Sequence, residues 1–218
     1  MKLLIFASLL CVDSTTRDKL LDLMTGVSQN AFANETGVLK FGLFFPREEP
    51  NDKLLYSIEE YANQAAFDSH LASGPVVEMF KWINSANIYS RPAEFYSLDS
   101  SPEFVTTRPE LGTAKDPYVV VRQTNYLEGK RELALPAWTD VVSAASNETG
   151  SLLSGIYTDP TDSKRMFTID VSVSKQYWLE THLRSKAYVE AKEISKSVEN
   201  GTEVSILKLS GGFLYKPE

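Results

Sequence analysis

NETGVLKFG, residues Asn34–Gly42, returns later in the chain as NETGSLLSG, residues Asn147–Gly155. Each copy places a second glycine five residues after the first. The two histidines of the chain also occupy matching positions, His70 in DSHLAS and His182 in ETHLRS. Self-similarity of this kind predicts a duplicated unit of roughly 100 residues.

The first copy has the element order of a split βαβ unit. The runs 3–10, 38–45, 53–60 and 94–98 are rich in apolar or β-branched residues and predict strands. One helix is expected after Thr15 or Thr16 as its N-cap, and a second from residue 63 or 64, with a break at Gly74-Pro75. Gly37 in the NETG turn is expected to take a positive φ.

The second copy repeats this order. Strands are predicted over 118–124, 151–158, 165–173 and 203–209, with one long helix over 175–198. A further helix is predicted over 136–146, because proline suits the first helical turn. The sequence thus predicts an α+β fold of two ferredoxin-like βαββαβ repeats, residues 1–98 and 118–218, joined by a proline-containing linker over 99–117.

The opening stretch MKLLIFASLLCVDS can be interpreted as a secretory leader or as the first strand. It aligns with the run Tyr118-Val-Val-Val-Arg, which lies in mid-chain and cannot be a leader. We therefore expect residues 3–10 to be a strand of the folded protein, and the protein to be cytoplasmic.

Composition excludes several classes of function. The 218-residue chain carries a net charge of −7 without a dense Lys/Arg run, which argues against nucleic acid as a partner. One cysteine and two histidines make a zinc site unexpected, so no metal is predicted. No later apolar run reaches the roughly 18 residues that a membrane span needs, and no membrane partner is expected.

The run SIEEYANQAAFDSHLAS, preceded by NETGVLKFGLF, resembles the antibiotic biosynthesis monooxygenase family of the dimeric α+β barrel superfamily. The second copy departs from the family pattern, since it keeps Asp170 and His182 but lacks the Tyr-Ala and Ala-Ala-Phe elements. The resemblance implies that the two repeats pack as a pseudo-dimeric α+β barrel within one polypeptide, as a monomer or as a homodimer. The residues that match the family motif are Glu59, Tyr61, Ala62, Ala65, Ala66, Phe67 and His70.

The same resemblance implies a cofactor-independent monooxygenase of secondary metabolism. Its partners would be O2 and a small aromatic substrate, an aromatic polyketide or another phenolic molecule that is oxidised to a quinone. Neither G-x-G-x-x-G nor G-x(4)-G-K-[ST] occurs, and no cofactor is predicted. Two alternatives remain: a non-oxidative cyclase, isomerase or lyase on the same scaffold, and a non-catalytic barrel that binds a small molecule.

Removal of a substrate proton needs a base, and a histidine suits that task near neutral pH. His182 and His70 are the candidate catalytic residues, although their recurrence in both copies favours a structural role. Arg122 and Asn125 make the first strand of the second copy more polar than its counterpart. Such a strand can be a solvent-facing edge, or it can line a pocket, which would favour the second copy as the site of the pocket. The candidate substrate-binding residues are Tyr61, Trp82, Asn125, Arg122, Trp178 and Tyr157.

Overall fold

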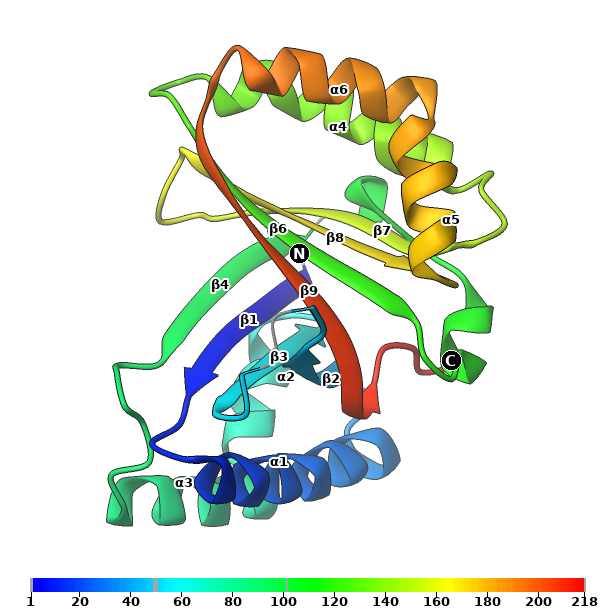
Figure 1. The fold of residues 1–218 in the computed structure, drawn as a ribbon. Coiled ribbons are helices and arrows are strands. Elements are labelled where there is room, and N and C mark those ends of the chain that lie inside the picture. Colours follow the sequence, from blue (N-terminus) through cyan, green and yellow to red (C-terminus); the bar gives the residue numbers. More distant parts are fainter. Residues whose placement is uncertain (1, 49–50, 101, 218) are drawn as a thin grey trace. The chain divides into compact units, whose positions relative to one another are not determined.

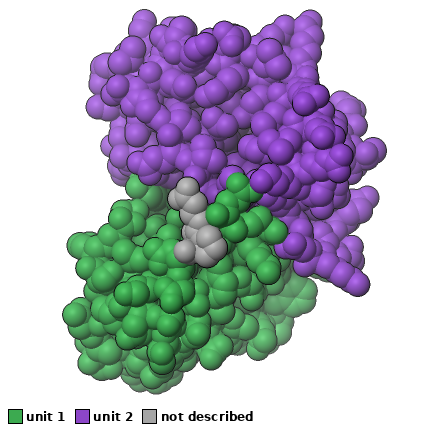
Figure 2. Space-filling model, in the orientation of Figure 1, with its two compact units in different colours: residues 1–97, 208–218 green, residues 98–207 purple. Residues whose placement is uncertain are grey.

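The computed structural model describes residues 2–48, 51–100 and 102–217. The chain divides into two compact units, coloured separately in Figure 2: residues 1–97 with 208–218, and residues 98–207. Strands β4 (Glu94–Ser100) and β9 (Glu199–Phe213) each contribute residues to both units. Among the described residues, no helix is long and apolar enough to cross a membrane.

The first unit has the strand order β4-β1-β3-β2, with β9 beside β2. Both β1 and β2 run antiparallel to β3. Its helices lie over one face of this sheet (Figure 1). The remaining elements are β1 (Lys2–Leu10), α1 (Ser14–Asn34), β2 (Val38–Pro46), β3 (Leu54–Tyr61), α2 (Gln64–Leu71) and α3 (Gly74–Ser85).

The second unit has the order β9-β6-β8-β7-β5, which repeats the first order with β5 added. The predicted fold class, α+β with two ferredoxin-like repeats, is confirmed. The segment 99–117 contributes a short strand, β5 (Val105–Thr107), and 3₁₀ helices at Pro102–Phe104 and Pro109–Thr113. The remaining elements are β6 (Tyr118–Tyr126), α4 (Arg131–Ala145), β7 (Ser151–Thr158), β8 (Arg165–Ser172), α5 (Lys175–Glu180), a 3₁₀ turn at His182–Arg184, and α6 (Lys186–Lys196).

Three helix boundaries differ from the prediction. Asp13, rather than a threonine, caps α1 by accepting a hydrogen bond from the Thr16 amide at 2.7 Å. Pro136 lies inside α4 and not in its first turn. The long helix expected over 175–198 is broken into α5 and α6, because Ser174 and Ser185 each cap a new helix through their side chains.

The NETG glycines are needed for space and not for a positive φ, which corrects the expectation for Gly37. A Cβ on Gly37 would lie 2.5 Å from Cβ of Ala66, at the start of α2. A Cβ on Gly150 would lie equally close to the ring of Tyr177 in α5. The small residue therefore lets the second helix of each repeat approach the turn that precedes the second strand.

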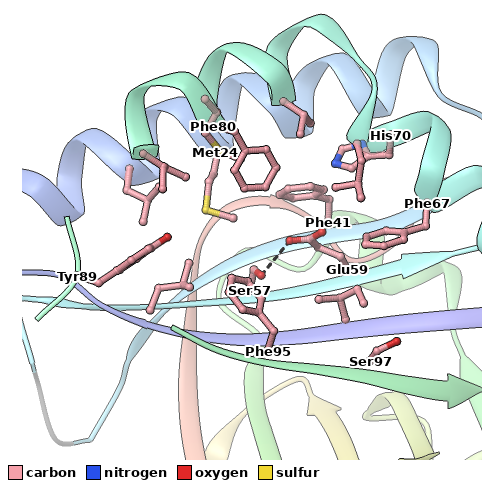
Figure 3. Close-up of a pocket in the computed structure, with 17 residues that line it drawn as sticks. Met24, Phe41, Ser57, Glu59, Phe67, His70, Phe80, Tyr89, Phe95 and Ser97 are labelled. Carbon is pink, nitrogen blue, oxygen red and sulfur yellow. Dashed lines mark hydrogen bonds between the residues drawn. The ribbon is translucent and has the colours of Figure 1, made fainter. Parts of the chain in front are cut away.

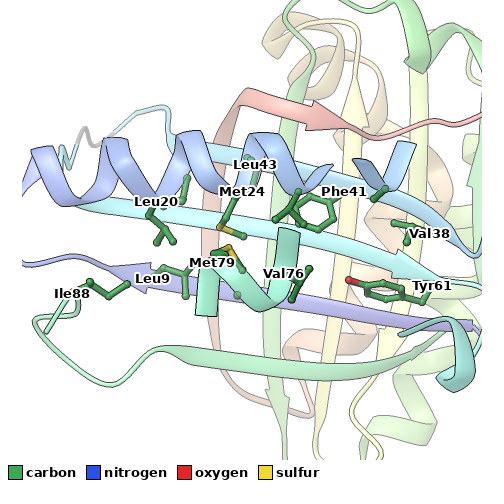
Figure 4. Packing of buried hydrophobic residues seen from close by; sticks show 14 of the residues in the cluster. Leu9, Leu20, Met24, Val38, Phe41, Leu43, Tyr61, Val76, Met79 and Ile88 are labelled. Atoms are coloured by element: carbon green, nitrogen blue, oxygen red, sulfur yellow. The ribbon is translucent and has the colours of Figure 1, made fainter. Parts of the chain in front are cut away.

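The core of the first unit lies between the sheet and its helices (Figure 4). Leu20, Met24, Val27 and Ala31 recur at helical spacing along α1 and are buried against the sheet. Leu4, Phe44 and Ile58 are also buried but lie outside this cluster, so β1 to β3 bury side chains on both faces. This explains why the N-terminal strand has a nearly continuous apolar sequence.

Gly212 gives a stability prediction. Its φ is +76°, and an added Cβ would lie 1.9 Å from the Phe41 carbonyl oxygen. Gly129 has a similar φ of +68° with open space around it. We expect Gly129→Ala to cost about 1 kcal/mol, from backbone strain alone, and Gly212→Ala about 3 kcal/mol or more. Urea unfolding measures both, and equal losses would contradict the close contact at Gly212.

Candidate functional site

The first unit contains a cavity of about 440 Å³ between the helical layer and the sheet (Figure 3). Its wall is almost entirely aliphatic, aromatic or thioether, as is usual for a site that takes a small organic molecule. The apolar lining residues are Ile5, Leu9, Leu20, Met24, Phe41, Phe67, Leu71, Val76, Met79, Phe80, Ile83 and Phe95, and the polar ones are Ser57, Glu59, His70, Tyr89 and Ser97.

Glu59 is the carboxylate of this cavity. It lies on β3, is 9% exposed, and accepts hydrogen bonds from the Ser57 hydroxyl at 2.9 Å and the Tyr61 hydroxyl at 2.6 Å. Burial raises the pKa of Glu59 above its usual value, while the Tyr61 hydrogen bond and the nearby His70 charge partly oppose that rise. A carboxylate in such a setting is a stronger base than one in water.

His70 reaches the same cavity from α2. Asn63 caps this helix through the Ala66 amide at 3.0 Å, and His70 lies on the inward face with 3% exposure. Its Nδ1 is 2.8 Å from Oε2 of Glu35, in the NETG turn. The rings of Phe41 and Tyr61 flank the imidazole at centroid distances of 5.6 and 5.4 Å. The ring is therefore held firmly at the cavity wall.

The second unit repeats these polar groups around another histidine. Asp170 on β8 is at the position equivalent to that of Glu59 on β3. Each of the two residues lies opposite the middle of both neighbouring strands. Nδ1 of His182 lies 2.9 Å from Oε2 of Glu148, and its Nε2 lies 3.5 Å from Oδ1 of Asp170. Burial alone would lower the pKa of His182, but its contacts with Asp170 and Glu148 raise that pKa to about 10.

The interior of the second unit is filled where the first is hollow. Trp138 takes the place of Met24 on the first helix of the repeat, and Tyr188 takes the place of Val76. The Trp138 indole donates to Ser195 at 2.7 Å, and Arg122 donates to the Tyr188 hydroxyl at 2.7 Å. The space left beside Trp138 and Asp170 is too small for a water molecule. Arg122 on β6 therefore helps to fill this interior and does not line a pocket.

This corrects the sequence-based preference for the second copy as the site of the pocket. Arg122 neither lines a pocket nor forms a solvent-facing edge, because it donates a hydrogen bond to Tyr188 and lies 6.0 Å from the Trp138 ring centroid. The strand register places Arg122 opposite Thr168, whereas Ala7 faces Ser57 at the matching position of the first unit. The second unit therefore has a large cationic side chain, Arg122, where the first unit has Ala7.

His182 gives a pH prediction. A pKa raised from 6.5 to about 10 means that the folded protein binds the proton more tightly than the unfolded chain. The resulting stabilisation is complete below about pH 6.5 and is lost as pH rises through 10, a change of a few kcal/mol. Chemical unfolding at a series of pH values should show this slope, and His182→Asn should remove it. An equal slope in that variant would contradict the assignment.

The remaining predicted site residues lie apart from the cavity wall. Tyr61 is fully buried behind Glu59, and Trp82 stacks under Lys19, whose Nζ is 4.6 Å from the ring centroid. Trp178 packs on Tyr118 at 5.7 Å. The other two are the buried Tyr157 on β7 and the partly buried Asn125 on β6.

Sequence reasoning missed two acidic residues of the site. The sequence places Glu59 only within a family motif, and Glu35 only within the repeated NETG turn. The recurrence of Glu35 and Glu148 in NETG, together with the paired histidines, was the signal that could have linked each glutamate to its histidine. Glu59 carries no such signal, because only the register of β3 shows that it faces the helices.

Comparison with known proteins agrees with the fold. Residues 9–82 match the family model for antibiotic biosynthesis monooxygenase. A candidate monooxygenase of Lactobacillus acidophilus superposes with a TM-score of 0.79 at 16% identity, over 98% of both chains. A candidate monooxygenase of Fusobacterium nucleatum gives 0.76 at 15% identity, over 100% of this chain and 98% of that one.

An anthrone oxidase-like protein superposes with a TM-score of 0.67 at 12% identity, covering 96% of this chain and 91% of its own. No curated protein matches the chain. These structures share the fold over nearly the whole chain, and the family model covers the repeat that contains the cavity. Over residues 9–82, in its first repeat, the chain is therefore similar to the antibiotic biosynthesis monooxygenase family.

Proposed function

We propose that the protein is a cofactor-independent monooxygenase, and that it oxidises a phenolic or aromatic polyketide molecule in the cavity of its first unit. The observation that supports this most is the position of Glu59, a buried carboxylate of raised pKa in a wall that is otherwise largely apolar. Such a wall binds a flat organic molecule, while the carboxylate can remove an acidic proton from it.

The chemistry suits a methylene activated by a carbonyl, as in an anthrone. Glu59 takes one methylene proton, and the resulting enolate transfers an electron to O2. The two radicals combine to form a carbon–oxygen bond, and Glu59 returns its proton to the peroxide. Loss of the second methylene proton then breaks the oxygen–oxygen bond. One oxygen atom stays as a carbonyl, the other leaves as water, and every electron gained by O2 comes from the substrate.

Two further points support this proposal. The largely apolar wall solvates charge poorly, which raises the basicity of the carboxylate and favours a delocalised anion over a compact one. The fold is shared with a protein named as anthrone oxidase-like, which makes an anthrone a sensible first substrate. We propose a secondary-metabolic role in the cytoplasm, with the small molecule and O2 as the partners.

Oxygen uptake tests the proposal. Purified protein in buffer freed of metals by a chelator is mixed with a panel of anthrones and hydroquinones, and ¹⁸O₂ is used to label the product. We expect O2 consumption with one ¹⁸O atom in each quinone formed from an anthrone. Product formation without O2 uptake would contradict an oxygenase and indicate a cyclase, isomerase or lyase. Binding without turnover would indicate a ligand-binding protein.

A further inference from the structure

We propose that Glu35 is a positioning residue that makes His70 the proton exit of the cavity, so that Glu35, His70 and Glu59 act as one relay. This inference rests on the proposed function for its substrate class. In the proposed cycle Glu59 returns the first methylene proton to the peroxide, so the second one needs a carrier out of a largely apolar cavity. His70 is the titratable group on the wall with a second carboxylate behind it.

The contacts of Glu35 fit this role. Its Oε2 is 2.8 Å from Nδ1 of His70, and its Oε1 accepts a hydrogen bond from Asn30 at 2.9 Å. A carboxylate at Nδ1 holds the proton on that nitrogen and leaves Nε2 as the acceptor for the cavity side. The His70 side chain is 4% exposed, whereas that of Glu35 is 16% exposed. The carboxylate therefore connects a buried imidazole to solvent.

The charged groups around this pair are few. Glu59 faces the same cavity as His70, and the positive form of His70 lowers the pKa of the Glu59 carboxyl. Lys216 donates to the backbone carbonyls of Glu35 at 2.9 Å and Ala31 at 3.0 Å, and burial lowers its pKa. The Lys216 ammonium group therefore binds backbone carbonyls of the turn, and the Glu35 carboxylate remains in contact with His70.

The second repeat shows what the same groups do without a cavity. His182 has a carboxylate at each ring nitrogen, Glu148 at Nδ1 and Asp170 near Nε2, which keeps it protonated. In the first repeat the hydroxyls of Tyr61 and Ser57 bind the equivalent carboxylate. Among the described residues, His70 pairs with a carboxylate only through Nδ1. A proton can therefore pass through His70, whereas His182 retains its proton.

Proton transfer can be measured without oxygen. Anthrone is incubated anaerobically with the protein in D₂O, and the rate of deuterium entry into its methylene is followed by NMR above the protein-free rate. We compare wild type with Glu35→Gln, with Glu35→Asp and with Glu148→Gln, the matched change in the filled repeat. The anthrone Kd of each variant is measured in parallel, because a positioning residue changes the rate and not the affinity.

We expect Glu35→Gln to slow exchange about 10- to 100-fold with a Kd within about twofold of wild type. Glu35→Asp should recover much of the rate, and Glu148→Gln should exchange normally. Normal exchange in Glu35→Gln, equal loss in Glu148→Gln, or no exchange in wild type would each overturn the relay. Normal wild-type exchange without O2 consumption would instead overturn the oxygenase proposal while leaving the relay intact.

Discussion

Glu59→Gln is expected to lower turnover by about 10²- to 10⁴-fold, the range for loss of a general base. Glutamine has nearly the same shape and can still accept a hydrogen bond from Tyr61 or Ser57, so the cavity should persist. Removing a buried charge should leave the unfolding free energy unchanged or slightly higher. Oxygen uptake measures the loss, and the anthrone Kd should stay within about threefold of wild type.

The pH profile sharpens this prediction. Because burial raises the pKa of Glu59, kcat/KM of the wild type should fall on the acid side with a midpoint above that of an ordinary glutamate. Asp170→Asn, at the equivalent strand position in the second unit, is the matched control and should keep full turnover per folded molecule. Full activity in Glu59→Gln would refute the assigned base.

Met24→Trp is expected to weaken substrate binding at least 100-fold. The second repeat has Trp138 at the equivalent position. In the first repeat, the larger indole would occupy the cavity beside Glu59. The extra volume goes into existing space, so the stability loss should stay at or below about 1 to 3 kcal/mol. Calorimetric titration with anthrone measures the affinity.

Trp138→Met is the converse control. It removes an indole packed on Tyr188 at 5.5 Å and bonded to Ser195, so it should cost about 3 kcal/mol of stability. Turnover of the folded protein should not change, because the site lies in the first repeat. Undiminished binding in Met24→Trp, or activity lost in Trp138→Met, would contradict a single functional cavity.

Much of the fold was predictable because local patterns and tertiary packing agree. Residues 3–10 have a continuous apolar pattern, and the structure pairs them as β1 with β3 in the fold core. The NETG repeat and the paired histidines predicted two copies with the same strand order. Helix ends were less certain: Thr15 and Asp13 are both good N-caps, and only the backbone geometry selects Asp13.

The candidate site was predicted only in part. His70 was identified from its motif and lies on the cavity wall, yet the same reasoning applied equally to His182. The two histidines differ in the size of the side chains around them. Met24 and Val76 leave a cavity beside His70, whereas Trp138 and Tyr188 fill the equivalent space beside His182. Sequence patterns record which face of a helix is apolar, but not whether the side chains on that face meet across the core.

The amino-acid sequence by itself determined the duplication, the order of strands and helices, and the two histidines, because these depend on periodicity and on short local motifs. Only the tertiary structure decided that the cavity belongs to the first repeat, that Glu59 faces it, and that each histidine pairs with the glutamate of its NETG turn. Glu35 and His70 are far apart in the chain, and the contact between them exists only once α2 has packed beside that turn.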